Sequence, residues 1–427
     1  MNVLELKQAL ERGDYDETFA WLYPGKLEGQ RERYLHIADE FGTRFGENRP
    51  VVLCSAPGRS EIGGNHTDHQ QGRVVAAAVT LDAVAVASPN DQNVIRIFSE
   101  GHGEERVNLE KLEIVPAEMG TSASLIRGIA ARFYELSLRF GGFDAYVSST
   151  VLAGSGLSSS AAYEVLVGVI LAHLYNGGRV PPVVLAKVGQ FAENVYFGKP
   201  CGLLDQCASA VGGFAAKDFL NPGNPMVESI SCDPAKEGYA LCLVDAGGSH
   251  ANLTPEYAAI PEEMRSVAKL LGEDVLGKTS EADFYAKIGE LRSKVSDRAL
   301  LRAMHFYGEN RRALEQAEAL KAGEFQRFLK LVRESGESSK DLLQNVYPSG
   351  DVGERSVSLA LGLCARLLGK DGAWRVHGGG FAGTVQAFVP LHQLEEFRTA
   401  MENVFGAGTC HDLSVRPTGG ILVESKS

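Results

Sequence analysis

The chain has 427 residues, of which 44% are hydrophobic and 22% charged, proportions typical of globular proteins. This length predicts two domains with room for large cores. The formal net charge of −12 argues against a nucleic acid partner, because binding a phosphate backbone requires a basic face. A bound anionic nucleotide would therefore need local hydrogen-bond donors or a metal ion.

Membrane and secretory signals are also missing from the sequence. The N-terminus lacks the apolar segment of a secretory signal, and no apolar stretch is long enough to span a bilayer. The seven cysteines are odd in number and form no C-x-x-C pair, which argues against a zinc site or a disulfide framework. Together these features predict a cytoplasmic protein with free thiols and no membrane contact.

Apolar periodicity predicts strands and helices in mixed order along the chain. The predicted strands span residues 51–55, 74–88, 94–98, 143–151, 240–245, 373–377, 384–389 and 421–424. The predicted helices span residues 1–47, 157–175, 185–196, 310–331, 356–368 and 394–405, within a helical region that also covers about 257–342. Mixed elements without repeats predict an α+β fold. The Pro/Gly-rich stretch 221–225 marks a domain seam, which gives domains of 1–225 and 226–427.

The segment 56–69 follows the first predicted strand and reads Ala-Pro-Gly-Arg-Ser-Glu-Ile-Gly-Gly-Asn-His-Thr-Asp-His. Buried charges need partners to offset lost hydration, so such a segment is not ordinary core. Its glycines allow sharp turns or a close approach to a ligand. We expect a rigidly held loop that presents hydrogen-bonding groups to a small polar molecule, and a solvated surface turn is the alternative.

Residues 151–162, Val-Leu-Ala-Gly-Ser-Gly-Leu-Ser-Ser-Ser-Ala-Ala, lie between a predicted strand and a predicted helix. Backbone N–H groups at a helix N-terminus can point at a phosphate, and serine hydroxyls add further donors. Ser160 could also ligate Mg²⁺. A well-capped helix packed through small residues is the alternative interpretation.

Two other glycine-rich segments match known nucleotide-binding patterns in the wrong context. Residues 272–279 fit the Walker A pattern, but a predicted helix precedes them where a P-loop needs a strand, so we expect a helix end and a turn. Residues 378–383 fit Gly-x-Gly-x-x-Gly, but a predicted strand follows them where a dinucleotide-binding fold needs a helix. We expect a glycine turn between two strands.

The segment 201–206, Cys-Gly-Leu-Leu-Asp-Gln, places one acid among apolar residues. A lone carboxylate there needs a partner, and Arg59 is the candidate, since an adjacent guanidinium lowers a carboxyl pKa. Phosphoryl transfer usually uses a carboxylate to accept the hydroxyl proton. The alternative is a structural Asp205 that caps a helix or turn.

These motifs resemble those of galactokinases, members of the GHMP family of small-molecule kinases. The segment 58–69 resembles the sugar signature Gly-Arg-Val-Asn-Leu-Ile-Gly-Glu-His-Thr-Asp-Tyr, with departures at Glu61, Gly63, Asn65 and His69. Residues 151–162 resemble the family's ATP loop without its proline. Residues 378–383 resemble the third motif, Gly-Gly-Gly-Phe-Gly-Gly, with Ala382 for one glycine, and residues 201–206 resemble its Cys-Gly-x-x-Asp-Gln segment.

The resemblance implies a two-domain GHMP architecture, with an N-terminal domain like ribosomal protein S5, a ferredoxin-like C-terminal α/β sandwich and the active site between them. It implies Asp205 and Arg59 as catalytic residues, with ATP and Mg²⁺ as cofactors and a sugar as substrate. Implied sugar contacts are Asn65, His66, Asp68, Gly202 and Tyr257. Implied nucleotide contacts are Gly154, Ser155, Gly156, Leu157, Ser158, Ser159, Ser160, Gly379 and Gly380. Implied metal ligands are Ser160 and Glu193.

The most favoured activity is phosphorylation of D-galactose at the anomeric hydroxyl by a monomer or weak dimer. Galacturonate is the rival substrate, because the neutral Asn65 amide in place of the family Glu could donate a hydrogen bond to a C6 carboxylate. The run Asp68-His69-Gln70 is also similar to plant galacturonate kinases. An amino-sugar kinase and a kinase-like sugar sensor are further alternatives. A later family segment, Ser-His-x-Ser-Leu, has no recognisable match around residues 335–339.

Overall fold

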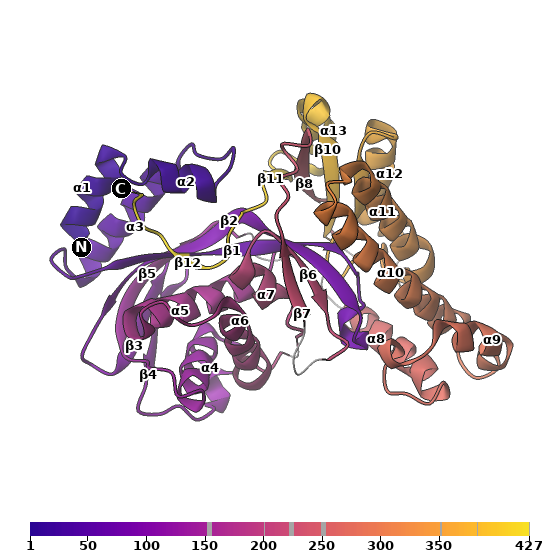
Figure 1. Ribbon diagram of the computed structural model, residues 1–427, viewed down its shortest axis with the longest axis horizontal. Coiled ribbons are helices and arrows are strands. Elements are labelled where there is room, and N and C mark those ends of the chain that lie inside the picture. The colour runs from indigo at the N-terminus through magenta and orange to yellow at the C-terminus, as the bar shows by residue number, and fades with distance from the viewer. Residues whose placement is uncertain are drawn as a thin grey trace.

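The computed structural model describes residues 1–151, 156–199, 201–221, 226–248, 253–350, 352–381 and 383–426. They form an α+β fold with two sheets, and the expected fold class is confirmed (Figure 1). The larger sheet has the order β12-β1-β2-β5-β3-β4, and β6 pairs with β2 and β7. All its pairs are antiparallel except β3 with β5. Its strands are β1 (Val52–Gly63), β2 (Arg73–Pro89), β3 (Val94–Ser99), β4 (Gly103–Asn108), β5 (Phe143–Ser149), β6 (Phe214–Asp218), β7 (Met226–Ile230) and β12 (Ile421–Leu422).

Helices cover both faces of the larger sheet, which explains the nearly unbroken apolar run of β2. Ala85 and Ala87 face one core, whereas Val84 and Val86 face another, as the two-residue repeat of a strand requires. The first core packs under α4 (Ser122–Glu135), α5 (Ser159–Asn176), α6 (Pro182–Phe191) and α7 (Leu204–Val211). The second packs under α1 (Val3–Arg12), α2 (Asp16–Leu22) and α3 (Gln30–Phe45), beside which the C-terminus ends (Figure 1).

The smaller sheet has the antiparallel order β11-β8-β10-β9. Its strands are β8 (Tyr239–Asp245), β9 (Ala373–Val376), β10 (Thr384–Pro390) and β11 (Cys410–Leu413), and its helices α12 (Ser356–Leu368) and α13 (Leu394–Phe405) pack on one face. The rest of this half is helical, with α8 (Thr254–Leu270), α9 (Glu281–Arg292), α10 (Asp297–Lys321) and α11 (Phe325–Ser338). The larger core also includes residues of α10, α11 and the smaller sheet, so it joins the two sheets.

Several predicted boundaries differ from the structure. The segment 56–69 is not a continuous loop, because β1 runs through it to Gly63 with two register shifts, and only the turn after Gly63 is irregular. The predicted helix 310–331 is two helices, α10 and α11, which meet at Gly323 in a left-handed conformation. The predicted helix 1–47 is three helices for the same kind of reason, since Gly13 and Gly29 also adopt positive φ.

The expected domain boundary at 225/226 falls between β6 and β7, which pair in the larger sheet. The C-terminal β12 also returns to that sheet, beside β1. The segment 272–279 follows the end of α8 and forms a turn with one short 3₁₀ segment, as predicted. The division of the chain into two separate folding units remains a prediction.

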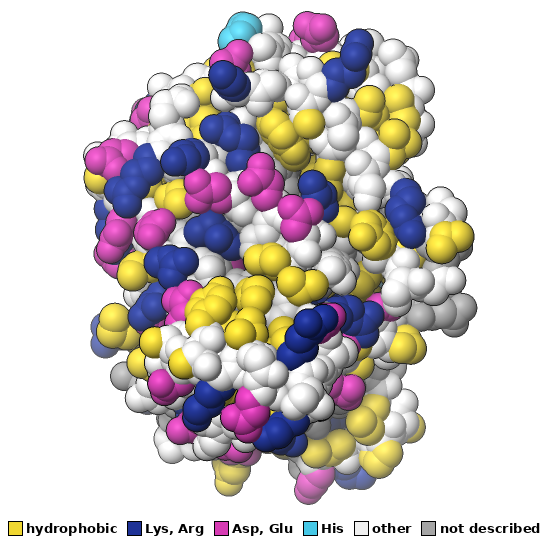
Figure 2. All heavy atoms as spheres, turned by 90° about the vertical axis from the view of Figure 1, so that its right-hand side faces the viewer, with side chains coloured by type: hydrophobic (Ala, Val, Ile, Leu, Met, Phe, Trp, Pro, Cys, Tyr) yellow, Lys and Arg dark blue, Asp and Glu magenta, His cyan; other side chains and the backbone are white. Residues whose placement is uncertain are grey.

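The face formed by the helical half carries intermixed acidic and basic side chains with scattered hydrophobic ones, so this face has no continuous field of one charge (Figure 2). None of the described helices is both long and apolar enough to cross a lipid bilayer. All seven cysteines are free.

Candidate active site

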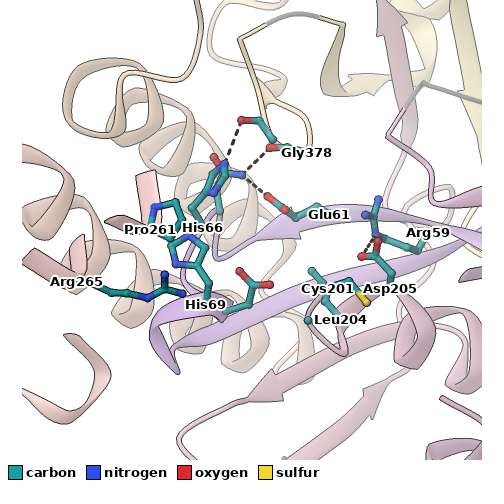
Figure 3. A pocket seen from close by; sticks show the side chains of 14 residues that line it. Arg59, Glu61, His66, His69, Cys201, Leu204, Asp205, Pro261, Arg265 and Gly378 are labelled. Carbon is teal, nitrogen blue, oxygen red and sulfur yellow. Dashed lines mark hydrogen bonds and ion pairs between the residues drawn. The ribbon is translucent and has the colours of Figure 1, made fainter. Parts of the chain in front are cut away.

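A pocket of about 600 Å³ lies where β1, α7, α8 and the glycine turn before β10 converge (Figure 3). It gathers residues from four distant parts of the chain. Its lining residues are Arg59, Glu61, Asn65, His66, Asp68, His69, Cys201, Gly202, Leu204, Asp205, Pro261, Arg265, Gly378 and Gly379. Six of the seven residues expected from the sequence to act on the sugar or in catalysis line this pocket, and the seventh, Tyr257, does not.

Asp205 and Arg59 form the centre of one end of the pocket. Arg59 Nε donates to Asp205 Oδ1 at 2.7 Å, and Ser158 Oγ donates to the other carboxylate oxygen. Burial raises the pKa of Asp205, but the charge and hydrogen bond of Arg59, together with Ser158, outweigh burial and lower it below its usual value. The Asp205 side chain is 32% exposed, so an ionised carboxylate faces the pocket.

The start of α5 lies directly against this pair. Arg59 donates through Nη1 to the carbonyl of Gly156, and its backbone N–H donates to Leu157 O at 3.0 Å. A Cβ at Gly58 would come within 3.0 Å of that same Leu157 oxygen, so a side chain there would push the segment away from β1. Gly154 and Ser155 lie outside the described residues. From Gly156 onward, the expected phosphate loop adjoins the candidate base.

Ser160 and Glu193 meet as expected for a shared metal site. Ser160 Oγ donates to Glu193 Oε1 at 3.2 Å, and Lys199 Nζ forms an ion pair with the same oxygen at 3.1 Å. Gln206 Nε2 donates to Glu193 Oε2 at 2.8 Å, which fixes the carboxylate from α7, the helix that carries Asp205. Mg²⁺ commonly takes one or two protein carboxylates and completes its shell with phosphates and waters. The described residues contain no cluster of three His, Cys, Asp or Glu ligands, and this sparse pair fits a nucleotide-borne Mg²⁺.

Asn65 lines the pocket but is 1% exposed and fully engaged by the protein. Its amide nitrogen donates to Glu61 Oε1 and to Gly378 O, both at 2.8 Å. Its Oδ1 accepts from Asn345 Nδ2 at 2.9 Å and from Ser339 Oγ at 3.4 Å. Neither amide hydrogen is left for a sugar, so the argument that Asn65 would favour a C6 carboxylate loses its physical basis.

Glu61 and Asn65 exchange the residue types of the family signature, which has Asn at the first position and Glu at the second. Because they bond to each other, the pair still consists of one carboxylate and one amide. Arg375, which is fully buried, donates to Glu61 Oε1 at 3.0 Å and to Ile62 O at 3.0 Å. The departure at Asn65 is therefore part of a compensated exchange rather than an isolated loss.

His66 and Asp68 lie beside each other in the turn after β1. Burial lowers the pKa of His66 to about 4, so the imidazole is neutral near pH 7, and its Nε2 lies 3.1 Å from Gly379 O. A carbonyl can only accept, so Nε2 carries the hydrogen and Nδ1 remains an acceptor. Burial, with Asp205 nearby, raises the pKa of Asp68. A Cβ at Gly202 would come within 2.7 Å of Asp68 Oδ2, so Gly202 leaves room for this carboxylate.

The glycine turn closes the pocket from the smaller sheet. Gly378 and Gly380 adopt positive φ, and a Cβ at Gly380 would come within 2.1 Å of Asn345 O. Tyr257 donates to Gly380 O at 3.0 Å, and its ring would be 2.7 Å from a Cβ at Gly379. Tyr257 therefore contacts the turn that borders the pocket. The predicted turn between strands is confirmed for its described residues.

Sequence reasoning missed the buried polar groups that hold the turn after β1 from behind. Glu309 Oε1 accepts from Gly64 N at 2.9 Å, and His305 Nε2 lies 2.9 Å from Asn65 O. Ser335 donates to Glu309, and Ser338 bonds to His305 Nδ1. These groups lie on α10 and α11, far along the chain. A polar stripe at helical spacing in an otherwise amphipathic helix, Arg302, His305 and Glu309, was the available signal.

Comparison with known proteins gives the family. The galactokinase galactose-binding signature matches residues 39–89, and the N-terminal domain of GHMP kinases matches residues 124–213. The chain is 32% identical over 363 residues to a galactokinase of Glaesserella parasuis serovar 5 (strain SH0165), covering 84% of this chain and 90% of that protein. The chain belongs to the galactokinase family. It is thus a GHMP-type sugar kinase that uses ATP.

Solved structures agree on the fold. A Lactococcus lactis galactokinase complexed with galactose has a TM-score of 0.76 at 24% identity, covering 90% of this chain and 97% of that one. A Methanococcus jannaschii mevalonate kinase has a TM-score of 0.62 at 15% identity, covering 86% of this chain and 98% of that one. The GHMP kinase fold implied by the motifs is confirmed.

Proposed function

We propose that this enzyme transfers the γ-phosphoryl group of ATP to the anomeric hydroxyl of D-galactose, giving galactose 1-phosphate and ADP. The observation that carries this proposal is the ionised Asp205, held by Arg59 and Ser158 at the point where the sugar pocket meets α5. The match to the galactose-binding signature and the galactokinase relatives support galactose as the sugar.

In the proposed reaction, Asp205 accepts the proton of the anomeric hydroxyl. The sugar oxygen then forms a bond to the γ-phosphorus, the bond from that phosphorus to the bridging oxygen breaks, and ADP leaves with its electron pair. Arg59 keeps Asp205 ionised and lies where it can stabilise negative charge on the transferred group. No other carboxylate in the pocket combines an arginine partner with contact to α5.

We propose that the turn after β1 binds the sugar hydroxyls. Asp68 can accept hydrogen bonds from two neighbouring sugar hydroxyls, and His66 Nδ1 can accept one more. Gly202 brings backbone close to the ring without a side chain. The side chain of Asn65 bonds to Glu61 and to Gly378, and Tyr257 bonds to Gly380 in the glycine turn. We infer that Asn65 and Tyr257 hold these pocket segments in place rather than contact the sugar.

The nucleotide would lie over the N-terminus of α5, where the backbone N–H groups of the first turn and the hydroxyl of Ser159 can face phosphates, since Ser158 Oγ already donates to Asp205. Gly379 and Gly380 would border it from the other sheet. Ser160 and Glu193 would hold Mg²⁺, which neutralises phosphate charge when bound. Lys199 pairs with the same Glu193 oxygen, which places a cation beside the proposed metal ligands.

The direct test is product identification. Purified enzyme incubated with galactose, ATP and Mg²⁺ should form galactose 1-phosphate and ADP in equal amounts, as ³¹P NMR can measure. Binding of galactose and ATP without any phosphoryl transfer to a panel of hexoses would contradict the proposal and favour a sugar sensor. The cytoplasmic location and the monomeric or weakly dimeric state remain predictions.

A further inference from the structure

The pocket has a second polar end, remote from Asp205. It is formed by the two imidazoles of His66 and His69 and by Pro261 and Arg265 on α8 (Figure 3). The two imidazole ring centres lie 5.6 Å apart, and the Arg265 side chain reaches from its helix toward the His69 ring. In the proposed reaction the anomeric hydroxyl lies at the Asp205 end, so this end would face sugar substituents away from that hydroxyl.

Arg265 lacks a carboxylate partner in the described part of the chain. No ion pair or hydrogen bond joins its guanidinium to any of the described residues. The other carboxylates of the pocket have their own interactions: Asp205 pairs with Arg59, and Glu61 pairs with Arg375. Asp68 is not within ion-pairing distance of Arg265. An arginine directed into a binding pocket without a carboxylate is available to an anionic ligand group.

His69 presents an unused hydrogen-bond donor at the same place. Gln70 Oε1 accepts from Leu276 N at 3.0 Å, which fixes the amide so that its Nε2 points to His69 Nδ1 at 3.2 Å. An amide nitrogen can only donate, so Nδ1 accepts and the neutral ring carries its hydrogen on Nε2. His69 Nε2 is buried without a partner. Burial, aided by His66 and Arg265, lowers the pKa of His69, which keeps the ring neutral.

We propose that His69 and Arg265 form a carboxylate subsite, so that the enzyme phosphorylates a hexuronic acid of galacto configuration as well as the neutral sugar. This inference rests on the proposed 1-kinase function. Galacturonate keeps the ring hydroxyls of galactose and differs only at C6, where a carboxylate replaces the hydroxymethyl group. A carboxylate can accept from both the His69 N–H and the Arg265 guanidinium, whereas a C6 hydroxyl offers no charge to the guanidinium.

The residue types agree with this assignment. The galactokinase signature has Tyr at the position of His69, so the imidazole donor is a departure of this chain from that signature. Asn65, whose amide is engaged by Glu61 and Gly378, takes no part in this subsite. The carboxylate would instead be recognised from α8 and the short helix η1 (Asp68–Gln70).

The test compares D-galacturonate and D-galactose at equal ATP and Mg²⁺ in one coupled assay. The unmodified enzyme should have a kcat/KM for galacturonate at least equal to that for galactose. Arg265→Gln should lower the galacturonate-to-galactose ratio of kcat/KM by roughly 10- to 100-fold, the loss of one charge-assisted hydrogen bond. The effect should appear mainly in the KM for galacturonate. Arg265→Lys should retain part of the ratio.

Lys269→Ala is the matched control, because Lys269 is exposed, lies one turn further along α8 and does not line the pocket. It should leave the ratio unchanged. His69→Phe should lower the ratio without changing the charge of the pocket. Arg265 is exposed, so its variants should fold normally.

Three outcomes separate the possibilities. Galactose turnover without galacturonate turnover would overturn the carboxylate subsite and leave the proposed function standing. An Arg265→Gln effect of equal size on both sugars would overturn it too. Turnover of neither sugar by a folded enzyme would contradict the proposed function itself.

Discussion

At the scale of single residues, the site depends on the protonation states that burial and neighbours impose. Asp205 remains ionised because Arg59 and Ser158 outweigh its burial, whereas burial and the nearby charge of Asp205 raise the pKa of Asp68. The neutral imidazole of His66 keeps an acceptor lone pair on Nδ1, which we propose accepts from a sugar hydroxyl. Two adjacent acids therefore differ in role because their surroundings differ.

His66 should make the stability of the enzyme depend on pH in a defined window. Its folded pKa of about 4 lies below the ordinary value of 6.5, so the unfolded chain binds more protons between these values. The free energy of unfolding should therefore fall, relative to a His66→Asn variant, as the pH drops from 6.5 to 4. The slope should be at most about 1.4 kcal/mol per pH unit. Denaturant unfolding at several pH values measures it.

Asn is a suitable replacement because residue 66 has a φ of 57°, which Asn tolerates better than most residues. His392→Asn, at an exposed position, is the control and should follow the unmodified enzyme at every pH. A constant difference between the enzyme and the His66→Asn variant from pH 4 to 7 would contradict the assignment of a buried neutral imidazole.

At the scale of elements, one amide joins three parts of the fold. The side chain of Asn65 bonds to Glu61 of β1 and to Gly378 of the glycine turn. It also bonds to Asn345, which follows the short π-helix Ser339–Leu343 at the end of α11. It therefore sets the distance between the turn after β1 and the smaller sheet. The family signature has Asn and Glu where this chain has Glu61 and Asn65. The exchange is tolerated because the contact needs one carboxylate and one amide, whichever of the two positions carries each.

Asn65→Asp should destabilise the fold by about 3 kcal/mol or more, because it places two buried carboxylates 2.8 Å apart and removes two donated hydrogen bonds. Adding Glu61→Gln should restore part of that loss, since one acid and one amide would face each other again. Urea unfolding of the two single variants and the double variant measures the coupling. Strictly additive losses would show that the pair does not interact as described.

The sequence was sufficient to predict most elements, because their apolar periodicity is strong. The strand at β10, the helices α5, α12 and α13, and the turn at 272–279 follow from local pattern alone. Helix α10 ends earlier than predicted because its polar and apolar pattern continues through Gly323 into α11, and only the left-handed glycine marks the break. Helix α7 was missed because it is only eight residues long and many of its side chains are small.

The candidate site was predictable where the type of a residue alone requires a particular partner, and not where several partners were possible. Asp205 and Arg59 were paired on the argument that a lone buried acid needs a cation, and they lie 2.7 Å apart. The engagement of Asn65 could not be foreseen, because Asn345 and Gly378 are about 300 residues away in the chain. Arg265 was missed because nothing in the sequence of α8 distinguishes it from an ordinary exposed cation such as Lys269.

At the scale of the whole molecule, the reactive centre lies where the two sheets meet. The half with the larger sheet contributes β1 and helix α7, which carries Asp205, and the smaller sheet contributes the glycine turn. Helices α10 and α11 pack against both, and their buried Glu309 holds Gly64 in place. Small relative movements of the two halves would therefore change the pocket directly.

The most direct measurement of the central claim is the turnover and galactose binding of Asp205→Asn beside the unmodified enzyme. The account predicts that kcat falls by about 10³-fold, because the amide cannot accept the anomeric proton. Galactose should still bind with similar affinity by calorimetry, because Asp68 and His66 remain. Turnover within a factor of a few of the unmodified enzyme would contradict the assignment of Asp205 as the base.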